Sequence, residues 1–182
     1  MVKKLPKIIN QEEFEKLFAA VEKKHKFASE KRKPIIKQYK LAMLLGFEAG
    51  LRISEIVGWK DRVPKLTKQN IEGNSIRIVS GKGAKDRIVP RPKRMNNPAV
   101  DMLPLEIKRR ALQGFVTELA RKVLDKEISF HTLRHGFGSH LAGQGRPLHE
   151  IQMLMGHSRL DTTGIYLHAN PKKAIEGARD VF

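Results

Sequence analysis

Apolar residues recur at helical spacing along most of this chain, and this periodicity limits the possible folds more than any other feature. In segment 11–24, Asn10 is placed to cap a helix and Glu13 follows as its capping-box partner. A single apolar stripe there consists of Phe14, Leu17, Phe18 and Val21. Pro34 suits the start of a second helix and Gly50 its end. The pattern predicts further helices at 34–49, 53–58, 105–125, 130–143, 148–155, 161–168 and 171–179.

A clear β-hairpin is predicted in one place. Residues 75–79 alternate polar and apolar side chains, a turn follows at 81–83, and 87–89 form the return strand. Two glycines flank Lys82 in this turn and would let it lie close against another backbone. Residues 91–104 contain three prolines and two asparagines, which indicates a loop. We therefore expect a mostly α-helical domain with one small antiparallel β-sheet, an α+β fold.

The charge of the chain indicates a polyanionic partner. Lys and Arg total 36 against 19 Asp and Glu, which gives a formal net charge of +17 over 182 residues. A generically basic protein is the ordinary alternative. The absence of cysteine excludes disulfides, thiolate metal sites and a cysteine nucleophile. Neither a signal peptide nor a membrane span is evident, so we expect a cytoplasmic protein with one domain over residues 1–182.

Two segments carry residues suited to an anion. Arg52 stands between two expected helices among apolar neighbours, and a partly enclosed arginine needs an anion, either Glu55 or a phosphate. His131 and Arg134 share a helical face at i, i+3. His131 and His135 also resemble half of a metal site, but the pattern lacks the acidic or cysteine partners of known zinc motifs, so we expect no metal.

A third segment joins a histidine to a tyrosine near the end of the chain. Such residues are usually structural when they occur singly. Here Tyr166 lies nine residues beyond His157, in a short segment with polar flanks.

Together these segments resemble the tyrosine recombinase family, which includes phage integrases and Xer-type resolvases. The motifs occur in the family's order and span most of the chain. They read GLRISE at 50–55, GKGAKDRIVP at 81–90, HTLRH at 131–135, and GH at 156–157 followed by TTGIY at 162–166. The resemblance implies a catalytic-domain fold of that family.

The resemblance also implies cleavage and rejoining of double-stranded DNA without metal or other cofactor. Tyr166 would form a 3′-phosphotyrosyl bond, and His131 would accept its proton. Lys82 would protonate the leaving 5′ oxygen, while Arg52 and Arg134 would hold the phosphate. The implied catalytic set is Arg52, Lys82, His131, Arg134, His157 and Tyr166, with Glu55 in support. Further basic residues are expected to bind neighbouring phosphates: Lys85, Arg87, Arg91, Lys93 and Arg94.

The domain organisation departs from the family in one respect. Members usually carry a separate N-terminal DNA-binding domain, which we expect to be absent from this chain. Residues 170–182 are expected to form a tail helix, and the resemblance implies a homotetramer on paired recombination sites. Two alternatives remain open: a type IB topoisomerase, which relaxes supercoils by the same chemistry, and a non-catalytic DNA-binding protein derived from an integrase.

Overall fold

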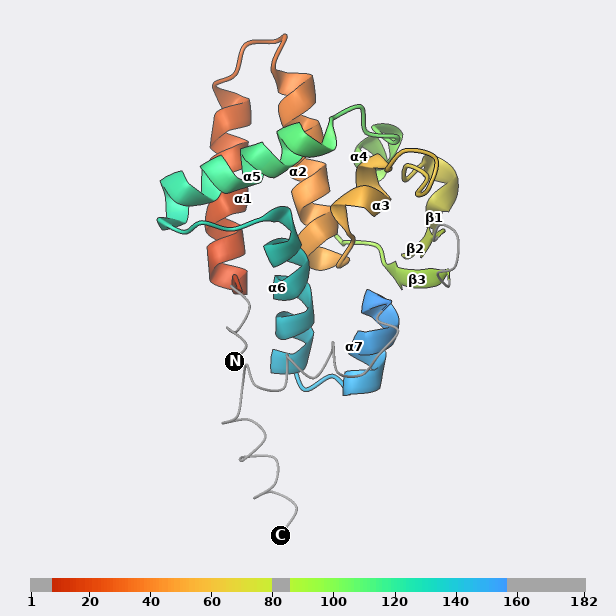
Figure 1. Cartoon of the computed structure of the whole chain (residues 1–182). Coiled ribbons are helices and arrows are strands. Elements are labelled where there is room, and N and C mark those ends of the chain that lie inside the picture. The colour runs from red at the N-terminus through yellow and green to blue at the C-terminus, as the bar shows by residue number, and fades with distance from the viewer. Residues whose placement is uncertain (1–7, 80–85, 157–182) are drawn as a thin grey trace.

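The structure, a computed structural model, describes residues 8–79 and 86–156 of the chain (Figure 1). Its longer helices are α1 (Gln11–Lys26), α2 (Lys33–Glu48), α5 (Arg109–Leu124), α6 (Phe130–Gly143) and α7 (Leu148–Met155). Its shorter ones are α3 (Ile53–Val57), the 3-10 helix η1 (Lys68–Asn70) and α4 (Asn97–Asp101). The strands are β1 (Ile71–Glu72), β2 (Ser75–Ile78) and β3 (Arg87–Pro90). The predicted fold class is therefore confirmed.

Helix α1 begins as predicted. The Asn10 side chain accepts a hydrogen bond from the Glu13 amide at 2.8 Å, and the Glu13 carboxylate accepts one from the Asn10 amide at 3.1 Å. The predicted apolar stripe is buried: Phe14, Leu17, Phe18 and Val21. The helix ends at Lys26, two residues later than predicted, and its last turn is basic, which suits the negative end of the helix dipole.

Helices α2 and α6 pack closely at the centre of the domain (Figure 1). A β-carbon added at Gly136 of α6 would stand 2.6 Å from the Phe47 ring of α2. One added at Gly46 of α2 would stand 2.8 Å from the Phe130 ring of α6. Because only glycine permits this approach, α6 lies directly against α2. Gly50 ends α2 with φ +65°, as predicted.

The pairing of the two predicted strands is confirmed, and a further strand extends the sheet, whereas the predicted turn at 81–83 lies outside the described residues. β2 pairs antiparallel with β3, with Ile78 opposite Arg87. β1 pairs with the other edge of β2, which gives the sheet order β1-β2-β3. β1 is only two residues long, and two residues are too few to show the alternation from which a strand is predicted.

Two predictions between β3 and α6 are wrong. The segment 91–104 was expected to be a loop but contains α4, which Asn96 caps by accepting a hydrogen bond from the Ala99 amide at 3.1 Å. The helix expected from residue 105 begins at Arg109. Apolar side chains at every second position precede it and are buried, which is the burial pattern of an extended segment and not of a helix: Leu103, Leu105 and Ile107.

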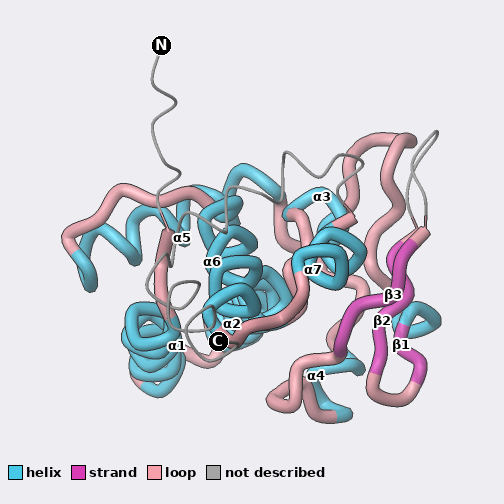
Figure 2. Tube along the Cα trace, turned by 90° about the horizontal axis from the view of Figure 1, so that it is seen from below, coloured by secondary structure: helices cyan, strands magenta, loops and turns pink. Residues whose placement is uncertain are grey.

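Helix α7 connects the helical part of the domain to the sheet. It packs against α6 on one side and against β3 on another, as the view from below also shows (Figure 2). α6 and α7 have the predicted bounds. In the described part of the chain, no helix combines the length and the apolar character needed to cross a membrane. The helices expected at 161–168 and 171–179 and the expected tail lie outside the described residues.

Candidate active site

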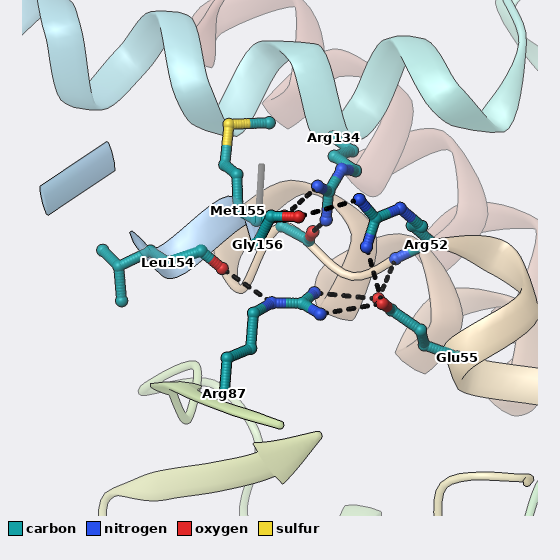
Figure 3. A network of polar contacts seen from close by, with 8 residues as sticks. Arg52, Glu55, Arg87, Arg134, Leu154, Met155 and Gly156 are labelled. Atoms are coloured by element: carbon teal, nitrogen blue, oxygen red, sulfur yellow. Dashed lines mark hydrogen bonds and ion pairs between the residues drawn. The ribbon is translucent and has the colours of Figure 1, made fainter. Parts of the chain in front are cut away.

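Two motifs distant in the sequence meet at the C-terminal end of α7 (Figure 3). Arg52 and Glu55 lie at the start of α3, and Arg134 lies in the middle of α6. The Arg52 and Arg134 side chains donate to carbonyl groups at the end of α7, and Glu55 pairs with Arg52 (Figure 3). Three other expected catalytic residues lie outside the described residues: Lys82, His157 and Tyr166.

Glu55 orients Arg52 and also caps α3. Its Oε1 accepts a hydrogen bond from Arg52 Nη1 at 2.9 Å, and its Oε2 accepts one from the Arg52 amide at 2.7 Å. The Arg52 side chain remains 37 % exposed, whereas that of Glu55 is 7 % exposed. The carboxylate is thus buried while the guanidinium reaches the surface, where it could meet a phosphate.

Arg134 is almost completely buried, with 1 % of its surface exposed. Its Nη1 donates to the Gly50 carbonyl oxygen at 2.5 Å, and its Nη2 donates to that of Met155. Both acceptors are carbonyl groups near the ends of helices, where carbonyls lack intrahelical partners and carry partial negative charge. Arg134 therefore joins the end of α2 to the end of α7.

Three successive carbonyl groups at the end of α7 each accept a hydrogen bond from a different arginine (Figure 3). Leu154 accepts from Arg87 Nε at 2.8 Å, and Gly156 accepts from Arg52 Nη2 at 3.3 Å. Arg134 donates to the residue between them. Three guanidinium groups thus meet at the end of α7, and one carboxylate, that of Glu55, pairs with two of them, Arg52 and Arg87. This excess of positive charge suits an anion such as a phosphodiester.

His131 lies one helical turn from Arg134, as predicted. Burial lowers its pKa, and the positive charges of Arg134 and Arg52 lower it further. Its ring contacts that of His135 edge to face, with centroids 4.4 Å apart. Burial lowers the pKa of His135 to about 4, and repulsion by the protonated form of His131 and by Arg134 adds to this effect. A neutral His131 can accept a proton near neutral pH.

His131 also lines an open pocket of about 470 Å³ formed by α5, α6 and the connection between them. This pocket leaves the histidine accessible from solvent. Among residues 8–79 and 86–156, no group of three or more potential metal ligands is found.

Three of the arginines that are expected to contact DNA have protein partners in this structure. Arg87 is 8 % exposed and binds Glu55. Arg91 donates to the Met95 carbonyl oxygen at 2.6 Å. Arg94 lies between two glutamates and covers the Phe18 ring at 4.3 Å. Lys93 is exposed, as a phosphate contact requires, and Lys85 lies outside the described residues.

Arg87 was expected to contact a DNA phosphate, and the structure shows its side chain buried against Glu55. Strand alternation was the signal that could have located it. In β3 the side chains of Arg87 and Val89 share one face and are buried, whereas Ile88 between them is 58 % exposed. An arginine at a position whose side chain faces the buried side of a strand indicates that it pairs with another group inside the protein.

Comparisons with known proteins identify the family of the chain. Residues 103–173 match the phage integrase family. Tyrosine recombinase XerA of Thermococcus kodakarensis is 32 % identical over 180 residues, which cover 89 % of this chain and 58 % of that protein. Tyrosine recombinase XerD of Vibrio vulnificus is 32 % identical over 193 residues, which cover 91 % and 57 %. The chain thus spans somewhat more than half of the length of these relatives.

Solved structures support the fold. A crystal structure of XerA recombinase superposes with a TM-score of 0.66 at 21 % identity and covers 96 % of this chain and 64 % of that one. The catalytic domain of bacteriophage HP1 integrase gives a TM-score of 0.63 at 21 % identity, over 94 % and 93 %. The fold is that of an integrase catalytic domain. The chain belongs to the phage integrase family, and its relatives over most of its length are tyrosine recombinases of the Xer type.

Proposed function

We propose that this protein is a site-specific DNA recombinase that cleaves and rejoins strands through a 3′-phosphotyrosine at Tyr166. The supporting observation is the convergence of Arg52 and Arg134 at the end of α7. His157 directly follows Gly156, whose carbonyl group accepts the hydrogen bond from Arg52, and Tyr166 follows His157 nine residues later. Family membership and this pair of arginines together favour phosphoryl transfer.

The proposed first step is an in-line displacement at phosphorus. The Tyr166 oxygen forms a bond to the phosphorus, and the bond from phosphorus to the 5′ oxygen of the next nucleotide breaks. Neutral His131 accepts the phenolic proton, and Lys82 donates a proton to the leaving oxygen. The reverse displacement by a 5′ hydroxyl rejoins the strand, so the phosphodiester energy is conserved.

The arginines stabilise the charge that develops on the phosphate. A guanidinium carries several donors in one plane and binds two phosphate oxygens better than an ammonium does. Arg52 and Arg134 now donate to carbonyl oxygens, which bear only partial charge. The transition state at phosphorus carries full negative charges, so it attracts these arginine donors more strongly than the carbonyl oxygens do. His157 is proposed to hydrogen-bond the same phosphate.

The proposed partner is double-stranded DNA. The net charge of +17 favours binding to its phosphate backbone. A XerH recombinase of similar fold has been solved bound to a palindromic difH substrate. For this chain we propose a homotetramer on paired sites, in the cytoplasm, with residues 1–182 acting as the catalytic domain.

Covalent trapping on a pool of nicked duplexes tests the proposal. Once a strand with a nick just beyond the cleavage site is cleaved, the short fragment that carries the new 5′ hydroxyl diffuses away and leaves the protein attached to DNA. We expect an adduct that resists denaturation with the parent protein and none with Tyr166→Phe, which should still bind DNA.

The chain offers a matched control because it contains two tyrosines. Tyr39 of α2 is stacked on Phe115 of α5 with ring centroids 4.3 Å apart, so its ring packs between these two helices. Tyr39→Phe should therefore trap DNA like the parent protein. An adduct formed by Tyr166→Phe would reject the assignment of the nucleophile. Relaxation of supercoiled DNA that carries no recombination site would favour a topoisomerase.

A further inference from the structure

Arg87 has more buried contacts than a strand residue needs for packing alone. Its Nη1 and Nη2 donate to Glu55 Oε1 and Oε2 at 2.8 and 2.9 Å. Its Nε donates to the Leu154 carbonyl oxygen at 2.8 Å. Every nitrogen of the guanidinium thus donates to a residue of another element, and one side chain joins β3, α3 and α7 (Figure 3).

The first consequence concerns Arg52. Glu55 accepts two hydrogen bonds from Arg87 and two from Arg52, one of them from the Arg52 backbone. Its carboxylate can therefore move only if Arg87 moves. Because Arg52 is partly exposed and Glu55 is its ion-pair partner, Arg87 fixes the Arg52 guanidinium through this carboxylate.

The second consequence concerns the end of α7. Arg87 holds the Leu154 carbonyl, two residues before the end of the described chain at Gly156. A β-carbon added at Gly156 would stand 2.9 Å from Arg87 Cδ. The arginine thus also contacts the residue directly before His157.

Stability alone does not explain this arrangement. Burying an ion pair costs desolvation energy that its attraction often only offsets, and apolar residues of similar volume can serve as well. What the planar guanidinium supplies is direction, because its donors fix two carboxylate oxygens and a carbonyl at once.

We propose that Arg87 is a positioning residue for strand cleavage: through Glu55 it orients Arg52, and through Leu154 it fixes the end of α7 from which the chain continues to His157. This proposal rests on the proposed recombinase function. It makes Arg87 part of the active site without contact between Arg87 and DNA.

The test compares Arg87→Gln and Arg87→Lys with the parent protein on a duplex that the parent cleaves. Arg87→Gln should lower the cleavage rate at saturating DNA by about a hundredfold, since small displacements of catalytic groups have effects of that size. DNA affinity should stay within about threefold, because Arg87 contacts no phosphate in this proposal. Arg87→Lys should recover only part of the rate, since an ammonium lacks the planar set of donors.

A pH profile separates positioning from a general loss of structure. Burial raises the pKa of Glu55, but Arg87 and Arg52 together hold it at about 2. Lys65 and Arg77 lie nearby, around a small pocket that Glu55 lines. With Arg87→Gln the pKa of Glu55 rises, so cleavage should decline on the acidic side at a higher pH than in the parent. Arg87→Lys keeps the charge and should largely restore the parent profile.

Arg77→Gln is the matched control. Arg77 lies on the neighbouring strand and pairs with Asp86 at 3.5 Å, but its side chain is 56 % exposed. This variant should cleave like the parent with the same pH profile. All rates are measured at a temperature where thermal unfolding shows each variant to be folded.

Hydrogen exchange provides a readout that does not depend on cleavage. Backbone amides near the end of α7 should exchange at least about tenfold faster in Arg87→Gln than in the parent or in Arg77→Gln. If the parent forms no adduct with any duplex, the proposed function fails, and exchange alone decides the role of Arg87. Unchanged exchange at α7 would overturn the positioning role, as would a parent-like rate and pH profile of a folded Arg87→Gln protein.

Discussion

Glu55 is a buried carboxylate that pairs with two arginines, Arg52 and Arg87. Burial raises its pKa, yet the hydrogen bonds and charges of Arg87 and Arg52 outweigh that effect and lower it to about 2. In the unfolded chain the ordinary value of about 4.5 applies. A carboxyl whose pKa is lower in the folded state stabilises that state above the unfolded pKa and loses this contribution as the pH falls toward the folded pKa.

Replacing Glu55 should therefore have a pH-dependent cost. We expect Glu55→Gln to lower the free energy of unfolding at pH 7 by about 3 kcal/mol, from the size of the pKa shift and the loss of a buried pair. The difference from the parent should narrow as the pH falls from about 4.5 to about 2. Urea unfolding at several pH values measures both effects.

Glu106→Gln is the control for this experiment. Glu106 pairs with Lys65 at 3.0 Å, but its side chain is 70 % exposed. Exposed pairs contribute about 1 kcal/mol or less, so this variant should differ little from the parent at any pH. A loss for Glu55→Gln as small as that for Glu106→Gln would contradict the role given to the buried carboxylate.

At the scale of elements, local signals were sufficient for most helices. The Asn10 capping box, the glycine after α2 and the bounds of α6 and α7 follow from neighbouring residues, and the structure agrees with each. The start of α5 was mispredicted because apolar residues at 103, 105 and 107 are buried by tertiary packing of an extended segment. α4 was missed because it is short and lies among prolines.

In the candidate site, too, contacts between residues close in sequence could be predicted and long-range contacts could not. Arg52 and Glu55 are three residues apart, so their pairing could be expected from sequence, and it is observed. The contacts of Arg87 with Glu55 and Leu154 join positions 32 and 67 residues apart. Contacts of that kind depend on how α3, α7 and β3 meet, which no local pattern specifies.

The end of α7 provides the prediction at this scale. Gly156 has φ +59° and lies against Arg87. Gly145 has φ +77°, and among the described residues a β-carbon added at Gly145 would meet no atom within 4 Å. Gly145→Ala should cost about 1 kcal/mol from backbone strain alone. Gly156→Ala should cost more, because the new methyl also displaces Arg87, and it should slow cleavage.

Unfolding free energies and cleavage rates of the two alanine variants test whether Gly156→Ala is more costly than Gly145→Ala. The shared positive φ makes Gly145→Ala the correction for backbone strain. If Gly145→Ala and Gly156→Ala lose the same stability and cleave at the same rate, the contact between Gly156 and Arg87 does not affect cleavage.

At the scale of the whole molecule, the excess of basic residues dominates. If every acidic side chain were paired with a basic one, 17 positive charges would remain. DNA binding should therefore release counterions and weaken steeply with salt. We expect affinity to fall at least about a hundredfold between roughly 50 and 200 mM salt, as for four or more phosphate contacts.

Two neighbouring cations separate binding from folding. Lys93 is exposed, and Lys93→Gln should reduce the salt slope by about one unit without loss of stability. Arg94 bridges Glu15 and Glu48, so Arg94→Gln should lower stability and leave the slope nearly unchanged. Fluorescence anisotropy over a salt series measures the slopes. The reverse pattern would mean that Arg94 binds DNA.

The central claim is that Tyr166 is the nucleophile of a DNA strand-transfer reaction. Mass spectrometry of a trapped adduct, after digestion of both DNA and protein, tests it most directly. We expect one modified peptide, in which a nucleotide is attached to Tyr166 through its 3′ phosphate. A nucleotide attached to any other residue, or cleaved DNA without attached protein, would contradict it.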